Sequence, residues 1–209
     1  ADPVPESSYT TPQNDTPLFT RIAYDDSNNR IMVIWRSNGN NQRPRIRVGK
    51  PNTNGTTTWE SEGAVYVGDY FCQQCDVIFL SHGRFVISYV ETTNNGSSWT
   101  SYWRMAKITE SGGNFTITLG TRTAIGGNAG YARNPRLVKI SNNRIAALFK
   151  VDANAYGNQG KPRVRVARII SGSGGSETGN TDMYVQGQSG TELSSDTMSN
   201  DLENAGAHF

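Results

Sequence analysis

Short apolar segments alternate with polar turns along the chain, and they recur at a regular interval. Three apolar segments, 31–35, 85–89 and 145–149, each end on an aromatic residue and each follow a tight polar turn that closes on an arginine. A polar turn between short apolar segments is typical of a β-hairpin. The turn arginines Arg30, Arg84 and Arg144 therefore mark three copies of one unit of about 55 residues.

Each copy contains three further segments with the character of a strand. A first strand precedes each turn, at 19–25, 76–80 and 136–140. A third strand follows each polar loop, at 44–48, 102–106 and 162–166, and a fourth is expected at 64–67, 115–119 and 182–185. The sequence therefore predicts an all-β protein of three tandem four-stranded antiparallel units, about 18–68, 69–127 and 128–186. They follow an extended segment, 1–17, and precede a polar extension or the start of a further unit, 187–209.

A sheet of four short strands cannot bury both of its faces by itself. Radial packing of such sheets against one another gives a β-propeller, which usually has about four to eight blades. Three units are too few, so we expect an incomplete propeller that a second copy or another polypeptide completes. The alternative is a closed three-fold arrangement, a trefoil or a prism.

Composition changes this picture little but excludes several functions. The chain has 20 Lys and Arg against 18 Asp and Glu, a formal net charge of +2, which gives no electrostatic reason to expect a nucleic-acid partner. No apolar run is long enough for a membrane span. No nucleotide-binding or phosphate-binding glycine motif occurs, and we expect no cofactor.

Cys72 and Cys75 are the only cysteines, and the chain has two histidines. These residues are too few for a closed zinc site, so no metal site is expected. A short-loop disulfide or a pair of inert thiols remains as the interpretation of Cys72 and Cys75.

Four Asn-x-Ser/Thr sequons occur in expected loops or at strand edges, where an attached glycan would project into water. They begin at Asn14, Asn54, Asn95 and Asn114. Together with the possible disulfide, they predict an extracellular or cell-surface glycoprotein.

Residues 20–22, 29–37, 45–48 and 54–59 together resemble a blade of the sialidase (BNR/Asp-box) propeller superfamily, and 92–99 is similar to its Asp-box turn. Propeller lectins and repeat-containing adhesins share this rhythm. The resemblance implies that Arg21 takes the place of the family's first carboxylate-binding arginine. The family also uses a Tyr activated by a Glu, for which Tyr24 beside Asp25, or Tyr89 with Glu91, are the candidates; we expect both pairs to be structural.

Two sets of arginines alternate with apolar residues, which places each set on one face of a strand. Such a basic ladder is either a solvated outer face or a site for acidic glycans. Aromatic side chains beside the long loops after the second strands can stack on sugar rings. The candidate ligand-binding residues are Arg45, Arg47, Trp99, Tyr156, Arg163 and Arg165.

The sequence thus favours a secreted or surface-displayed binding and adhesion module that recognises a carbohydrate or an extracellular protein. Two alternatives stay open: a fragment of a sialidase-type glycoside hydrolase, and a structural repeat protein of a larger assembly. The sequence does not decide whether the chain is an enzyme, although it leans against catalysis.

Overall fold

The computed structural model describes residues 17–38, 42–60, 63–92, 99–126, 132–151, 162–169, 183–185 and 191–192. These residues form antiparallel β-sheets, and no helix occurs among them. The prediction of an all-β protein is confirmed. No membrane-spanning helix is found in the same residues.

The strands form three sheets in chain order. The first sheet contains β1 (Leu18–Asp25), β2 (Arg30–Arg36), β3 (Pro44–Pro51), β4 (Thr57–Trp59) and β5 (Val65–Tyr66). The second contains β6 (Phe71–Ser81), β7 (Arg84–Thr92), β8 (Trp99–Ser111), β9 (Asn114–Leu119) and β10 (Thr123–Ala124). The third contains β11 (Ala132–Ser141), β12 (Arg144–Val151), β13 (Pro162–Ile169), β14 (Met183–Val185) and β15 (Thr191–Glu192).

The three sheets share one topology, and their first three strands pair in the same order. In each, the first strand forms a hairpin with the second, and the second pairs with the third. The turn arginines Arg30, Arg84 and Arg144 open the second strand in every sheet. Residues that pair with the same position of the second strand, counted from its arginine, therefore occupy equivalent positions, which allows the copies to be compared residue by residue.

The fourth strand of every sheet is broken into two short pieces. In the first sheet, β4 pairs with one end of β3 and β5 with the other. The second and third sheets repeat the arrangement, with β9 and β10 along β8 and with β14 and β15 along β13. The sequence predicted one continuous strand here, because the second piece is only two residues long in each copy.

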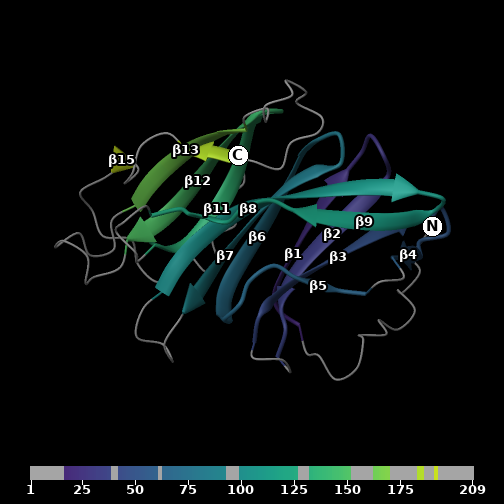
Figure 1. Cartoon of the computed structure of the whole chain (residues 1–209), viewed down its shortest axis with the longest axis horizontal. Coiled ribbons are helices and arrows are strands. Elements are labelled where there is room, and N and C mark those ends of the chain that lie inside the picture. The colour runs from purple at the N-terminus through teal and green to yellow at the C-terminus, as the bar shows by residue number, and fades with distance from the viewer. Residues whose placement is uncertain are drawn as a thin grey trace.

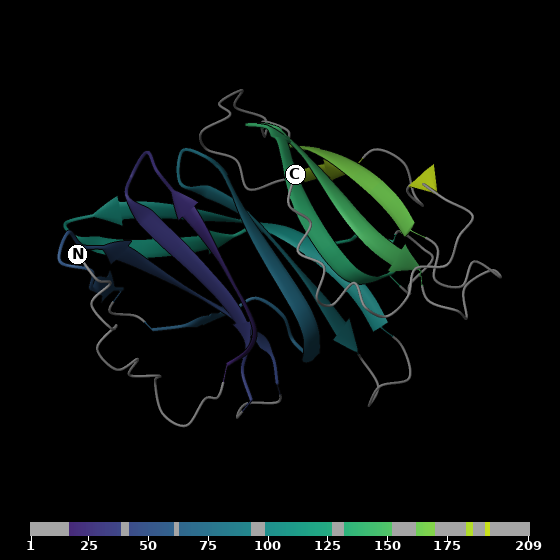
Figure 2. The ribbon, with the colours of Figure 1, turned by 180° about the vertical axis from the view of Figure 1, so that it is seen from behind.

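The sheets pack against one another in chain order, as Figures 1 and 2 show from opposite sides. One hydrophobic core lies between the first and second sheets and includes Met32, Ile34 and Ile87. A second core lies between the second and third sheets and includes Met105, Trp103 and Phe149. The described strands form neither a closed barrel nor a closed ring.

The middle sheet is covered on both faces, and this explains a feature of its sequence. All nine residues of β7 are buried, including Arg84, Ser88 and Glu91. A strand with two covered faces has no reason to alternate apolar and polar residues. The segment 85–89 accordingly shows a nearly continuous apolar run.

A β-bulge interrupts the first strand of every sheet at the same position. Phe19, Gln74 and Asn134 adopt left-handed backbone conformations there, with φ of 55°, 55° and 53°. The bulges also join neighbouring sheets, since the Asn134 amide donates to Gln74 Oε1 at 3.0 Å. A recurrent bulge of this kind is a structural device and not an irregularity.

The proposed disulfide is absent, because Cys72 and Cys75 are both free thiols on the same extended strand β6. Three residues of strand separate Cα atoms by roughly 10 Å, whereas a disulfide needs less than about 7 Å. Both side chains instead pack in the first core, and burial raises the pKa of the Cys75 thiol to about 12. The structure therefore leaves the second interpretation of these residues, inert thiols.

Candidate ligand-binding site

Three connections meet beside the start of β3, where the first and second sheets adjoin. They are the loop before β3, the β5–β6 connection and the β9–β10 connection. Gly68 allows this close approach, because a Cβ atom there would overlap the Glu91 carboxylate and come within 2.7 Å of Pro44 Cγ. Any larger residue at position 68 would push the β5–β6 connection away from β7.

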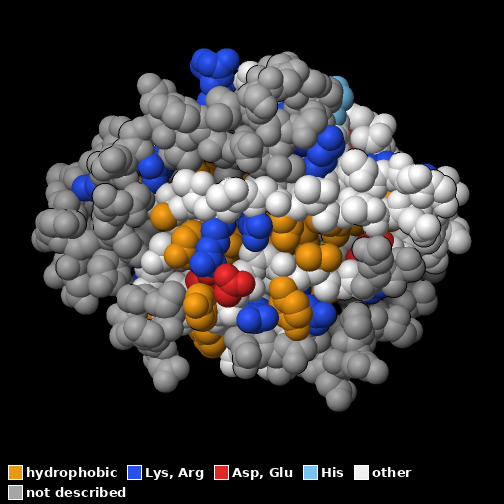
Figure 3. Space-filling view, viewed as in Figure 1, with side chains coloured by type: hydrophobic (Ala, Val, Ile, Leu, Met, Phe, Trp, Pro, Cys, Tyr) orange, Lys and Arg blue, Asp and Glu red, His pale blue; other side chains and the backbone are white. Residues whose placement is uncertain are grey.

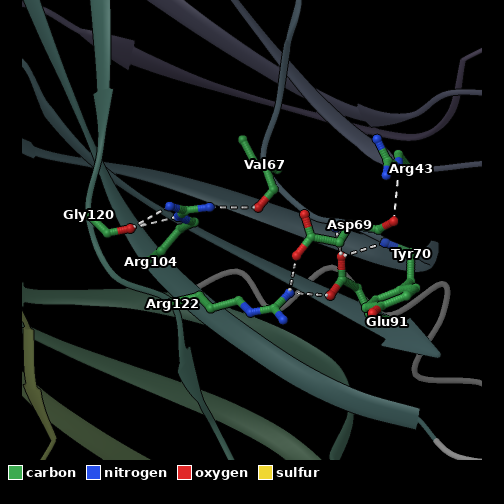
Figure 4. Close-up of polar contacts among 8 residues, drawn as sticks. All are labelled: Arg43, Val67, Asp69, Tyr70, Glu91, Arg104, Gly120 and Arg122. Atoms are coloured by element: carbon green, nitrogen blue, oxygen red, sulfur yellow. Dashed lines mark hydrogen bonds and ion pairs between the residues drawn. The ribbon is translucent and has the colours of Figure 1, made fainter. Parts of the chain in front are cut away.

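Glu91 holds the β5–β6 connection in place from the inner end of β7. Its Oε1 accepts hydrogen bonds from the backbone amides of Asp69 at 2.7 Å and Tyr70 at 3.3 Å (Figure 4). Its Oε2 lies 3.0 Å from Arg122 Nη1. Burial raises the pKa of Glu91, while these amides and Arg122 oppose the rise. A buried carboxylate with these partners fixes the geometry of the loop around it.

Arg122 links the buried carboxylate to the surface. The same Nη1 lies 3.1 Å from Asp69 Oδ2, and the guanidinium lies 4.7 Å above the ring of Tyr102. Partial burial alone would lower the pKa of Arg122, but Glu91 and its other neighbours raise it. Arg122 is therefore a fixed cation that remains partly accessible to solvent.

A second arginine lies on the other side of Asp69. Arg43 Nε donates to the Asp69 carbonyl at 2.8 Å, and its guanidinium lies 5.4 Å from the centre of the Tyr66 ring. Tyr70 is exposed beside them. We call Arg43, Tyr66, Tyr70 and Arg122, with Asp69 between them, the arginine–tyrosine surface. Figure 3 shows basic, acidic and apolar side chains gathered in the middle of the face that Figure 1 presents.

This surface combines two kinds of recognition chemistry. Guanidinium groups donate directed hydrogen bonds to carboxylates, and exposed tyrosine rings can pack on the apolar face of a sugar. The arginines are held in place by the tyrosine rings and by the Asp69 carbonyl, so little side-chain entropy remains to be lost on binding. The arrangement suits a ligand that carries a carboxylate beside an apolar ring face.

Arg45, which the sequence proposed as a ligand contact, adjoins this surface. Its guanidinium lies 4.8 Å from the ring centre of Tyr66. Arg47 follows on the same face of β3, as the period of two predicted, but serves another cluster. Its Nε lies 3.3 Å from Glu60 Oε1, and its guanidinium lies 5.2 Å from the Trp59 ring.

The other proposed contacts lie elsewhere. Arg163 and Arg165 belong to the third sheet, with the whole second sheet between them and Arg45. Arg165 is buried and donates to the carbonyls of Ala124 and Ile125 at 2.8 and 2.6 Å. Trp99 is buried at the start of β8 against Phe71. Tyr156 lies outside the described residues.

The candidate catalytic residues are either buried or hydrogen-bonded to residues close to them in the sequence. Tyr89 is fully buried, and burial raises the pKa of its phenol, so it stays protonated. Tyr24 is exposed and donates to Asn29 Oδ1, while Asp25 accepts hydrogen bonds within its own turn. Arg21 is half-buried on β1 and donates to the neighbouring Thr20 carbonyl.

The first strands carry charged residues at one equivalent position. Arg21, Asp76 and Arg136 pair with the same position of the second strand in the three sheets. Asp76 Oδ2 accepts from the Leu137 amide at 2.7 Å, which links the second sheet to the third. Burial raises the pKa of Asp76, against the effects of that hydrogen bond and of Arg136.

Sequence reasoning missed Arg43, Tyr66 and Arg122 as a group. Comparison of the copies could have found part of it: the position of Glu91 is Ser37 in the first copy, and that of Arg122 is Ala64. A charged pair that one copy of a repeat has and another lacks indicates a local role beyond the common fold. No grouping of His, Cys, Asp and Glu suited to a metal ion occurs in the described residues.

Two of the four sequons can be located. Asn54 lies in the exposed β3–β4 turn, and Asn114 is exposed at the start of β9. Asn14 and Asn95 lie outside the described residues. Glycosylation thus stays a prediction.

No family model matches the sequence, and no curated protein or solved structure matches the chain.

Proposed function

We propose that the chain is an extracellular or surface-displayed binding module, built as an arc of β-propeller blades, that recognises a carboxylate-bearing carbohydrate. The observation that carries the proposal is the arginine–tyrosine surface. There Arg43 and Arg122 are fixed by tyrosine rings and by Asp69, yet stay partly open to solvent. An acidic group on an extracellular protein is the alternative ligand.

The three sheets support the propeller part of this proposal through their shared topology and their packing in chain order. Exposed sequons at Asn54 and Asn114 support an extracellular setting. The arc is incomplete, because about four to eight blades close a propeller. We therefore propose that a second copy or another polypeptide supplies the remaining blades.

Binding is favoured over hydrolysis by the state of the residues that hydrolysis would need. A tyrosine nucleophile must reach the substrate, and Tyr89 is fully buried. The Glu91 carboxylate is occupied by two amides and Arg122, so it is not available as a base. The hydrolase alternative predicts release of sialic acid from a fluorogenic substrate and loss of that release in Arg21→Ala.

A glycan array that includes acidic and neutral glycans tests the proposal, followed by calorimetric titration of the glycans that bind. We expect acidic glycans to bind, and Arg43→Gln to weaken binding at least about tenfold, because a charge-assisted hydrogen bond contributes about 1.5–3 kcal/mol. Tyr70→Ala should weaken it as well.

Lys50→Gln is the matched control, because Lys50 is an exposed cation at the opposite end of β3 from Arg43. Equal loss of affinity in Arg43→Gln and Lys50→Gln would show that net charge, and not this surface, governs binding. A chain that binds no acidic glycan would contradict the carbohydrate proposal.

A further inference from the structure

Each sheet has two faces that differ in their neighbours. We call the face turned toward the preceding sheet the leading face, and the face turned toward the following sheet the trailing face. In the second and third sheets, the leading face carries Val77 and Leu137 at equivalent positions. In the first and second sheets, the trailing face carries Val48 and Met105. The two internal junctions are thus repeats of one another.

Among the described strands, none packs on the leading face of the first sheet. Ile22 occupies the position of Val77 and Leu137 there. Its side chain is 61% exposed, whereas Val77 is 4% exposed and Leu137 is 7% exposed. Ile22 thus has the residue type of a junction but stays exposed, although Val33 and Trp35 on the same face are buried.

The trailing face of the third sheet is open in the same way. Val166 occupies the position of Val48 and Met105 and is 42% exposed, whereas those two residues are fully buried. Ile140, which stands where the second sheet has the buried Leu80, is also exposed. The row of sheets therefore carries exposed apolar residues on a leading face at one end and on a trailing face at the other (Figure 1).

Charge complementarity between the two open faces is confined to their turns, since Arg45 and Arg168 make both faces basic elsewhere. Each buried turn arginine reaches the following sheet: Arg30 Nη2 lies 2.5 Å from Glu110 Oε2, and Arg84 Nη2 donates to the Asn142 carbonyl at 3.4 Å. Arg144, their equivalent in the third sheet, is exposed. Asn142 lies two residues before Arg144, and Asn28 lies two residues before Arg30 in the longer β1–β2 turn, which also contains the exposed acid Asp26.

The third strands carry arginines at a second equivalent position, and two of these also bridge neighbouring sheets. Arg104 Nη1 donates to the Val67 carbonyl at 2.9 Å, and Arg165 Nη1 donates to the equivalent carbonyl of Ile125 at 2.6 Å (Figure 4 shows the first). Each arginine therefore binds a carbonyl directly after the last strand of the preceding sheet. Arg47, the equivalent residue of the first sheet, is paired with Glu60 of its own sheet.

We infer that a second copy of this chain occupies both open faces, with the trailing face of each third sheet packed on the leading face of the other copy's first sheet. The inference rests on the incomplete arc of the proposed function and names what completes it. Arg144 would contact the partner's β1–β2 turn as Arg84 contacts the turn at Asn142. Two copies of three sheets give six, which is within the range that closes a propeller.

Sedimentation over a wide concentration range tests the inference with the whole chain. We expect a dimer, and we expect Ile22→Arg and Val166→Arg each to weaken dimerisation at least about 100-fold, because each buries an unpaired charge in the junction. Both side chains are exposed in the single chain, so the melting temperature of each monomer should stay unchanged. Thr118→Arg, which adds the same charge at an exposed position of β9, should dimerise normally.

An equimolar mixture of the two variants gives the decisive result. Each variant keeps the face that the other has lost, so a head-to-tail junction predicts that the mixture forms a dimer while each variant alone is monomeric. A mixture that stays monomeric, or a dimer that only one of the two substitutions disrupts, would overturn the inference, as would a wild-type chain that is monomeric throughout.

Tyr66 faces the same way as Ile22 on the first sheet, so a second copy on the leading face would cover part of the arginine–tyrosine surface. Glycan binding is therefore also measured on the monomeric Val166→Arg variant, which keeps the leading face intact. Monomeric wild-type chain that binds acidic glycans would overturn the junction and leave the binding function standing. A wild-type dimer whose monomeric Val166→Arg variant binds no acidic glycan would do the reverse.

Discussion

Glu60 is a buried carboxylate with few compensating contacts. It lies between β4 and β5, where Arg47 Nε approaches its Oε1 at 3.3 Å. Burial raises the pKa of Glu60 to about 7, although Arg47 and backbone hydrogen bonds act in the opposite direction. The folded chain therefore holds this proton at a pH where an exposed glutamate has lost it.

We predict that Glu60 makes the chain less stable as the pH rises from about 4.5 to 7. A carboxyl group whose pKa is raised on folding contributes stability below its unfolded pKa, and this contribution is lost as the pH rises through the folded pKa. The change amounts to at most about 3 kcal/mol, since one pKa unit corresponds to about 1.4 kcal/mol. Denaturant unfolding at several pH values measures it.

Glu60→Gln should remove this pH dependence and be more stable than the wild-type chain at pH 8. Asp26→Asn is the control, because Asp26 is exposed in a turn and its replacement should leave the pH profile unchanged. Identical profiles for Glu60→Gln and the wild-type chain would show that another group causes the dependence.

At the level of elements, the apolar pattern was sufficient for the strands with regular hydrogen bonding. The predicted second and third strands fall within β2, β3, β7, β8, β12 and β13, because a tight turn and an apolar run define each of them. The bulges at Phe19, Gln74 and Asn134 could not be predicted, because no glycine marks the left-handed position and Phe19 lacks the amide side chain that the other two share. The breaks in the fourth strands could not be predicted either, because the second piece of each is only two residues long.

The candidate site was predicted only in part, because the pattern within one strand does not show how the sheets pack on one another. Alternation placed Arg45 and Arg47 on one face, and β3 confirms this arrangement. Alternation within a strand does not reveal which sheet covers that face, however. Arg165 has the same local pattern as Arg47, yet it is buried against the second sheet because its own sheet follows another.

Arg104 joins two sheets, so its replacement should weaken the fold. Its Nε and Nη2 donate to the Gly120 carbonyl at 2.9 and 2.6 Å, and its Nη1 donates to the Val67 carbonyl. We predict that Arg104→Met lowers the free energy of unfolding by about 2–4 kcal/mol, because it leaves two carbonyls without this donor. Chemical denaturation measures the change.

Arg168→Met provides the comparison for Arg104→Met. Arg168 is exposed near the end of β13, and surface substitutions usually change stability by less than about 0.5 kcal/mol. Because Arg168 lies on the trailing face of the third sheet, both variants are compared on the monomeric Ile22→Arg background. A loss for Arg104→Met as small as that for Arg168→Met would mean that the arginine does not hold the first two sheets together.

For the whole molecule, the two cores assign different roles to the three sheets. The second sheet contributes to both cores, whereas the first and third sheets contribute to one each. In a stack of similar units, stability is approximately the sum of each unit's own stability and its junctions with neighbours. The middle sheet should therefore be the last to open, and β6 to β8 should show the slowest hydrogen exchange.

Substitutions in the two cores should then act on different ends of the molecule. Ile34→Ala removes packing from the first core and should accelerate exchange in β1 to β3 more than in β11 to β13, while Phe149→Ala in the second core should do the reverse. Each substitution should cost about 2–5 kcal/mol. If both variants instead accelerate exchange equally in all three sheets, the sheets open as one cooperative unit. Dimerisation through the two open faces would produce that result, because it gives the first and third sheets a second junction, so the comparison must be made on the monomeric Ile22→Arg background.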